Sequence, residues 1–218
     1  MEISTSILSV KKENAIQTFY NLEVAKTDYF HIDVMDGRFV EQNTQQDMIE
    51  YATTIKHISN IPLDVHLMVK HTKEQIEQYI ALNPAYITIH YEAFENEQKL
   101  NNIISYIKQN GCKVGISIKP DTPIEKVYNY LNKISLILVM TVEPGYGGQK
   151  LIESTIPKIR ELKKYIEQNN LECFIEADGG INQDNIKQLQ EAGVDIAVVG
   201  SAIINSNNMK ETIAKLKR

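Results

Sequence analysis

The 218-residue chain has few cysteines, no long apolar run and no excess of positive charge. Its two cysteines, Cys112 and Cys173, lack C-x-x-C spacing, so we expect two reduced core thiols in a cytoplasmic protein. The longest apolar stretches, such as 134–142, are far shorter than the roughly 20 residues that span a bilayer. The first residues, MEISTSIL, lack the basic segment of a secretion signal, so we expect neither membrane insertion nor removal of a leader.

The charge pattern also excludes some partners. The net charge is −5, and acidic and basic residues are interleaved along the whole chain, so we expect no surface for nucleic acid or for an anionic membrane. An anionic small molecule would have to be held by local features. No linker, low-complexity segment or charge block divides the sequence, and we expect residues 1–218 to form a single domain.

Short apolar runs rich in β-branched residues alternate eight times with longer amphipathic stretches. Helical patterns follow several of these runs, for example at 125–131 and 152–166. Strands that alternate with helices pair in parallel through right-handed crossovers, so the pattern predicts an α/β fold, a closed (β/α)8 TIM barrel, with an open doubly wound sheet as the alternative. The predicted strands are 3–8, 29–35, 62–68, 86–91, 113–118, 136–141, 173–178 and 196–199.

Histidine and aspartate alternate at the ends of two predicted strands. His31 and Asp33 in HIDVMDG share one strand face, as do Asp64 and His66 in PLDVHLMV, because side chains at i and i+2 point the same way. Asp178, in EADGGIN, ends another predicted strand. Barrel active sites collect at the carboxyl ends of the strands, and buried carboxylates need a compensating cation there. The sequence therefore predicts a divalent metal site at His31, Asp33, His66 and Asp178.

Other polar and soft side chains lie near these positions. Asp64 is one layer deeper than His66, so we expect it to orient an imidazole rather than to bind the ion. His90 ends the fourth predicted strand and could face the same space, but we do not expect it to be a ligand. Three methionines at strand ends fit either an apolar wall around the site or an ordinary core: Met35, Met68 and Met140.

Glycine-rich segments follow the last three predicted strands. Glycine lets backbone N–H groups approach an anion closely, and barrels often hold a phosphate with the loops after strands seven and eight. The sequence therefore predicts that backbone amides bind a sugar phosphate in a protein of net negative charge. The residues of these segments are Gly145, Tyr146, Gly147 and Gly148, then Gly179 and Gly180, then Gly200 and Ser201.

Five motifs, in order along nearly the whole chain, resemble those of the ribulose-phosphate 3-epimerase family: HIDVMDGRFV, PLDVHLMV, VMTVEPGYGGQK, EADGGIN and VVGSAI. The resemblance implies interconversion of D-ribulose 5-phosphate and D-xylulose 5-phosphate in the pentose phosphate pathway, with one divalent metal ion per subunit and a homo-oligomeric assembly. It implies metal ligands at His31, Asp33, His66 and Asp178, and an acid/base pair at Asp33 and Asp178. The implied substrate contacts are Ser6, His66, Gly145, Tyr146, Gly147, Gly148, Gly179, Gly180, Gly200 and Ser201.

This reaction removes a proton beside a carbonyl and returns one to the opposite face of a planar enediolate. It therefore needs two opposed acid/base groups, which we expect to be Asp33 and Asp178. A divalent metal ion would stabilise the enediolate oxygens as a Lewis acid. Two histidines and two aspartates accept zinc, iron, manganese or cobalt, so the donor set leaves the metal undecided.

The chain departs from the family pattern in three loops. Thr5 stands where the family commonly has proline, 41–43 reads Glu-Gln-Asn where Pro-Asn is common, and Tyr146 stands where phenylalanine is common. These positions bear on substrate choice, so a D-allulose 6-phosphate 3-epimerase with the same core residues is an alternative.

Two further classes of protein fit the residues less well. A phosphate-barrel decarboxylase would need lysine and aspartate where this chain has His66 and Val69. A binding protein without catalysis would not need two opposed carboxylates. We therefore expect an enzyme.

Overall fold

Eight parallel strands form a closed barrel in the computed structural model, which describes residues 1–218. Each strand pairs with the next one in the sequence, and β8 pairs with β1 to close the ring, so the predicted barrel is confirmed. Both faces of such strands are covered, which explains their nearly continuous apolar sequences. The strands are β1 (Glu2–Ser6), β2 (Tyr29–Met35), β3 (Leu63–Met68), β4 (Tyr86–His90), β5 (Lys113–Ile118), β6 (Leu136–Met140), β7 (Phe174–Asp178) and β8 (Ile196–Val199).

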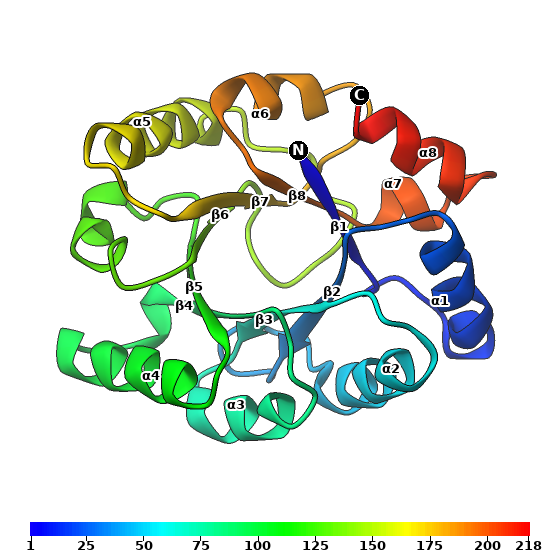
Figure 1. The fold of residues 1–218 in the computed structure, drawn as a ribbon, viewed down its shortest axis with the longest axis horizontal. Coiled ribbons are helices and arrows are strands. Elements are labelled where there is room, and N and C mark those ends of the chain that lie inside the picture. Colours follow the sequence, from blue (N-terminus) through cyan, green and yellow to red (C-terminus); the bar gives the residue numbers. More distant parts are fainter.

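The α-helices surround the barrel and cover its outer face (Figure 1). Their apolar residues pack on the strands, and the core lies mainly between strands and helices. None of the helices has both the length and the apolar character that a membrane span requires. The helices are α1 (Ala15–Val24), α2 (Gln45–Ile58), α3 (Thr72–Ile80), α4 (Glu97–Gln109), α5 (Thr155–Gln168), α6 (Ile186–Ala192), α7 (Ser201–Ile204) and α8 (Met209–Leu216).

The predicted helix at 125–131 is wrong. This segment forms two 3-10 turns, η3 (Ile124–Lys126) and η4 (Tyr128–Tyr130), so no α-helix separates β5 from β6. Its backbone hydrogen bonds span three residues, as from Lys126 N–H to Pro123 O. Seven residues after a proline provide too few i to i+4 bonds to offset the cost of starting an α-helix. The remaining 3-10 turns are η1 (Lys12–Asn14) and η2 (Tyr91–Ala93).

Several predicted boundaries shift by one to three residues. β1 ends at Ser6, where the prediction extended to residue 8, and α5 begins at Thr155 rather than at residue 152. Ile152 donates its N–H to Thr141 O, which holds this residue beside the end of β6 and delays the helix. Cys112 and Cys173 lie just before β5 and β7, and both are buried free thiols, as predicted.

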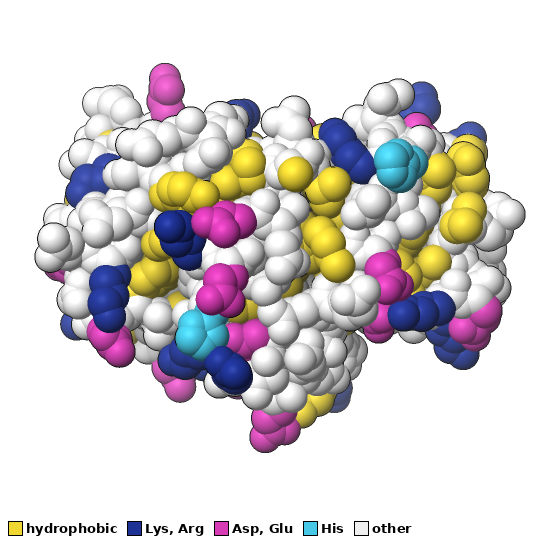
Figure 2. Space-filling model, turned by 90° about the horizontal axis from the view of Figure 1, so that it is seen from below, with side chains coloured by type: hydrophobic (Ala, Val, Ile, Leu, Met, Phe, Trp, Pro, Cys, Tyr) yellow, Lys and Arg dark blue, Asp and Glu magenta, His cyan; other side chains and the backbone are white.

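Charged side chains of both signs share the surface. Figure 2 shows lysine and arginine beside aspartate and glutamate on the face that it draws, with apolar atoms between them. Most of the ion pairs on the surface are exposed, such as Lys99 with Glu95 at 2.6 Å. Pairs of this kind contribute little to stability, so the apolar core is the main source of stability.

The barrel is tightly packed where β5 passes between β4 and β6. A Cβ added at Gly115 would lie 2.2 Å from Thr88 Oγ1 and 3.0 Å from Leu136 Cδ2. Threonine is branched at Cβ and cannot easily turn away. We expect Gly115→Ala to lower the free energy of unfolding by about 1–3 kcal/mol, measured by urea denaturation.

The paired control is the double variant Gly115→Ala/Thr88→Ala, which removes the hydroxyl that the new methyl group meets. Part of the lost stability should return. If Gly115→Ala alone unfolds at the wild-type urea concentration, the packing argument is wrong.

Candidate active site and metal centre

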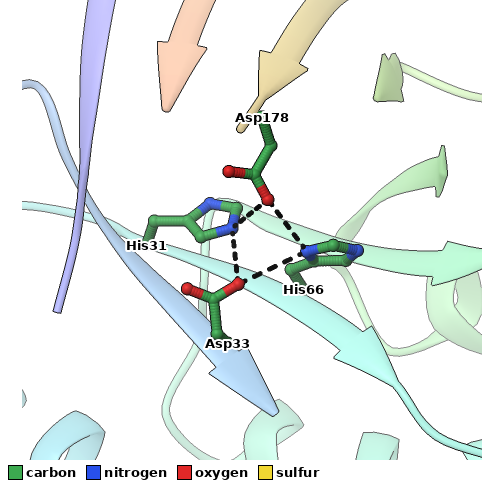
Figure 3. A group of neighbouring side chains, drawn as sticks. All are labelled: His31, Asp33, His66 and Asp178. Atoms are coloured by element: carbon green, nitrogen blue, oxygen red, sulfur yellow. Dashed lines mark ion pairs between the residues drawn. The ribbon is translucent and has the colours of Figure 1, made fainter. Parts of the chain in front are cut away.

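Three strands of the barrel bring two imidazoles and two carboxylates together at their carboxyl ends. His31 and Asp33 come from β2, His66 from β3, and Asp178 is the last residue of β7. Asp33 and His66 occupy paired positions of β2 and β3. Figure 3 shows the Asp33 and Asp178 carboxyl groups on opposite sides of the two imidazole rings. The structure thus gathers the four residues that the sequence predicts as metal ligands.

The donor atoms of these residues have the spacing of ligands around one small ion. His31 Nε2 lies 3.3 Å from Asp33 Oδ1 and 3.8 Å from Asp178 Oδ2. His66 Nδ1 lies 3.5 Å and 3.6 Å from the same two oxygens. Four ligands at about 2.0–2.2 Å from a tetrahedral centre would be about 3.3–3.6 Å apart. Both ring nitrogens are buried without a hydrogen-bond partner, so the residues present fit a divalent metal ion.

The electrostatics of the cluster also favour a cation. Burial acts to lower the pKa of His31, but the carboxylates of Asp64 and Asp33 outweigh it and raise the pKa well above its usual value. Burial acts to raise the pKa of Asp33, yet His31 and His66 lower it. The carboxylates of Asp33 and Asp64 therefore stabilise positive charge in the cluster, and a metal ion can supply that charge in place of protons.

Asp64 lies beneath the cluster and orients one of its imidazoles, as the sequence predicts. Its Oδ2 is 2.6 Å from His31 Nδ1 and also accepts a hydrogen bond from the Ser4 hydroxyl. A ring nitrogen bound to a carboxylate carries the proton, so the other nitrogen of His31 presents its lone pair to the site. The sequence prediction of a supporting role for Asp64 did not identify which imidazole it contacts.

Glu176 is a deeply buried group that the sequence analysis did not consider. It lies on β7 one layer below Asp178 and is fully buried beside Asp64. Burial, and next the negative charge of Asp64, raise its pKa well above the usual value of a glutamate. Both Glu176 carboxyl oxygens and Asp64 Oδ1 are buried without a hydrogen-bond partner in the structure, so the proton of the neutral acid is available to Asp64. The i and i+2 rule that singled out Asp64 would also have found Glu176.

His90 contacts the outer side of His66, and Glu92 contacts His90. His90 Nε2 is 3.0 Å from His66 Nε2, and His90 Nδ1 is 3.1 Å from Glu92 Oε2. Burial lowers the pKa of His90 to about 4. Burial acts to raise the pKa of Glu92, but His90 and hydrogen bonds from Lys119 and Thr122 lower it to about 2. No sequence pattern pointed to Glu92, which lies in η2 after the end of its strand.

A cavity of about 1010 Å³ opens above the two carboxylates. Its walls contain Asp33, Asp178 and the three methionines predicted at strand ends. His31 and His66 are fully buried and do not line it, so His66 is the predicted substrate residue that the cavity wall lacks. The predicted substrate residues in the wall are Ser6, Gly145, Tyr146, Gly147, Gly148, Gly179, Gly180, Gly200 and Ser201.

Two glycines after β7 allow neighbouring loops to approach one another. A Cβ on Gly180, which has a φ of 68°, would lie 2.3 Å from Leu151 N. A Cβ on Gly179 would lie 2.3 Å from Val142 Cγ2. Only glycine fits there, so the segment after β7 packs directly on the segment after β6 and exposes backbone to the cavity.

The loop after β2 reaches the loop after β6 across the mouth of the cavity. Tyr146 donates its hydroxyl to Glu41 Oε2 at 2.6 Å, although the two residues are 105 positions apart. Gln42 contributes to the cavity wall beneath this contact. Two of the positions that depart from the family pattern are therefore joined by one hydrogen bond.

The fold and the site place the chain among the (β/α)8-barrel enzymes. It is similar in structure to 3-hexulose-6-phosphate synthase from Salmonella typhimurium, with a TM-score of 0.69, 16% identity, and coverage of 99% of this chain and 96% of that one. It is also similar to KGPDC from Streptococcus mutans, with a TM-score of 0.70, 13% identity, and coverage of 99% and 95%. At such low identity these likenesses show the fold alone.

Sequence comparison is more specific. The model of the ribulose-phosphate 3 epimerase family matches residues 2–204, and the chain belongs to that family. It is 36% identical to ribulose-phosphate 3-epimerase of Helicobacter pylori strain J99 over 217 residues, which cover 100% of this chain and 97% of the relative. Identity to ribulose-phosphate 3-epimerase of Bacillus subtilis strain 168 is 34% over 218 residues, covering 100% and 98%. The chain is an isomerase of the epimerase type, which confirms the predicted family and enzyme class.

Replacing Glu176 tests whether this buried group is neutral. We expect Glu176→Gln to keep the free energy of unfolding within about 1 kcal/mol of wild type, because an amide has the shape of the neutral acid and can still donate to Asp64. Glu176→Ala leaves a cavity and an unpaired carboxylate oxygen, so it should cost about 2 kcal/mol or more. Urea denaturation at pH 7 measures both. Equal losses in the two variants would show that Glu176 is ionised.

Proposed function

We propose that this protein interconverts D-ribulose 5-phosphate and D-xylulose 5-phosphate by moving protons with Asp33 and Asp178. Membership of the family supports the reaction type and the pentulose substrate. The observation that carries the proposal is the placement of the two carboxyl groups on opposite sides of one site (Figure 3). Inversion at a carbon beside a carbonyl requires a base on one face and an acid on the other.

Asp33 has one oxygen for each of two tasks. Its Oδ1 faces both imidazoles, while its Oδ2 accepts a hydrogen bond from the Ser6 hydroxyl at 2.7 Å. Ser6 thereby fixes the rotation of the carboxyl group and keeps Oδ2 directed toward the cavity. In the proposed reaction Asp33 and Asp178 exchange the roles of base and acid between the forward and reverse directions.

His31, Asp33, His66 and Asp178 would hold one divalent metal ion, because their donor atoms have the required spacing. When bound, such an ion supplies Lewis-acid stabilisation of negative charge that develops on substrate oxygens. The protein side chains contribute orientation and exclusion of water. Met35, Met68 and Met140 line the cavity next to the cluster and are almost fully buried, so they keep this part of the site apolar.

The glycine-bearing loops after β6, β7 and β8 would bind the phosphate. They line the same cavity as the two carboxylates, so a substrate of pentulose length can reach from one end to the other. The backbone conformation at Gly145 and Gly148, with φ of 121° and 75°, directs amides in ways that other residues rarely allow. Backbone N–H groups bind an anion without adding basic side chains, which suits a chain of net charge −5.

Replacing either proposed acid/base group should stop epimerisation. We expect Asp33→Asn and Asp178→Asn each to lower kcat by about 10²- to 10⁴-fold, because an amide cannot accept the proton. A coupled assay on D-ribulose 5-phosphate measures turnover, and circular dichroism checks that the barrel is intact. A turnover close to wild type in either variant would contradict the mechanism.

Exchange of substrate hydrogen with solvent deuterium distinguishes the role of Asp33 from that of Asp178. Each variant retains one carboxylate, so each should exchange the C3 hydrogen of one epimer with solvent while failing to invert it. The two variants should differ in which epimer exchanges, as followed by proton NMR in D₂O. Exchange of the same epimer by both variants would exclude bases on opposite faces.

Removal of the metal tests the cluster. We expect a chelator to abolish turnover and added zinc, iron, manganese or cobalt to restore it, because the unscreened carboxylates cannot stabilise an anionic intermediate alone.

The same assay compares D-ribulose 5-phosphate with D-allulose 6-phosphate on metal-defined enzyme. Both relatives are named ribulose-phosphate 3-epimerase, so we expect the higher kcat/KM for D-ribulose 5-phosphate. Full activity after complete metal removal, or a higher kcat/KM for the hexulose phosphate, would contradict the proposal.

A further inference from the structure

His66 is connected to the protein through two further side chains on its outer side. In Figure 3 one ring nitrogen of His66 faces the two carboxylates and the other points away from them. That second nitrogen, Nε2, lies 3.0 Å from His90 Nε2, and His90 Nδ1 lies 3.1 Å from Glu92 Oε2. The other oxygen of Glu92 accepts hydrogen bonds from the Lys119 N–H at 2.8 Å and from the Thr122 hydroxyl.

This chain of contacts has one consistent arrangement of protons. An ionised Glu92 only accepts, so His90 must carry its proton on Nδ1. His90 Nε2 then carries only a lone pair, so it accepts a hydrogen bond from the N–H at His66 Nε2. In its neutral form His66 therefore keeps Nδ1 free of a proton, and Nδ1 is the atom that faces Asp33 and Asp178.

The packing around the two rings prevents other solutions. The His66 and His90 rings are stacked with centroids 5.0 Å apart and an angle of 28°, and both residues are buried. Phe39 lies against the other side of His90 at 4.7 Å. Neither imidazole can rotate to find another partner, so the positions of the protons are decided by Glu92.

We propose that Glu92 and His90 are positioning residues that hold His66 in the tautomer whose Nδ1 lone pair faces the ligand cluster. The inference rests on the proposed metal centre for its function. His31 is oriented by Asp64 directly, whereas His66 is oriented by Glu92 through His90. Each imidazole of the cluster thus depends on a carboxylate behind it.

Glu92→Gln reverses this arrangement without changing the shape of the side chain. The Lys119 N–H and the Thr122 hydroxyl both donate to one oxygen, so the amide oxygen must occupy that position. The amide NH₂ group then faces His90 Nδ1 and donates to it. His90 must carry its proton on Nε2, and the proton of His66 moves to Nδ1, where a metal ion would bind.

The test compares Glu92→Gln with Asp121→Asn. Asp121 is exposed and lies next to Thr122 in the loop after β5, so its replacement removes one negative charge near the Glu92 contact without touching His90. Two measurements are made: the Kd for Co²⁺ by calorimetry, and the His90 tautomer by ¹⁵N NMR of metal-free protein at alkaline pH. We expect Glu92→Gln to raise the Kd by about 10- to 100-fold and to move the His90 proton from Nδ1 to Nε2. Asp121→Asn should change neither.

The outcomes are separable. Wild-type protein with His90 protonated on Nε2, or a Glu92→Gln variant with unchanged tautomer and unchanged Kd, would overturn the proposal. The wild-type NMR measurement decides the question even if the variant does not fold. Failure of wild-type protein to bind Co²⁺ or to epimerise would instead count against the proposed function, because the tautomer is read in metal-free protein.

Discussion

Two carboxylates, the buried Asp33 and the partly buried Asp178, lie within 4 Å of the same two imidazole nitrogens at the open end of the barrel. Desolvated negative charge of this kind is tolerated only beside positive charge. The arrangement therefore constrains the residues around it: the imidazoles must present lone pairs or protons inward, and whatever lies behind them must hold them in that orientation. The placement of Asp33 and Asp178 opposite one another is electrostatically costly. A reaction on both faces of a planar intermediate requires this same placement.

The support for this cluster is layered along the barrel axis. Asp64 lies behind His31, and Glu176 lies beside Asp64, where burial and the charge of Asp64 raise the pKa of Glu176 and so oppose a second negative charge in the interior. His66 is supported sideways instead, through His90 to Glu92, which is anchored by the backbone of the next loop. A barrel provides both routes. Neighbouring strands end side by side, and side chains at i and i+2 of one strand point inward at successive levels of the barrel.

Much of the fold and the ligand set follows from local sequence. Alternating apolar runs predicted the eight strands, and spacing of two within a strand predicted which His and Asp side chains share a face. The prediction of a helix at 125–131 was wrong because the segment with helical periodicity is too short to form an α-helix after Pro123. Contacts across strands, such as Asp64 with His31 or His90 with His66, depend on register and loop path. A single sequence does not encode these in any local pattern.

The contact of Tyr146 with Glu41 shows how this fold separates chemistry from recognition. Both residues lie in loops at the mouth of the cavity, and Tyr146 is half exposed, so their hydrogen bond adds little to stability. Asp33 and Asp178, the proposed acid/base groups, instead lie near strand ends, in positions fixed by the ladder of the sheet. Loop changes such as 41–43 can therefore alter the space available to the sugar without moving Asp33 or Asp178. Departures from the family pattern at the mouth are compatible with an unchanged reaction for this reason.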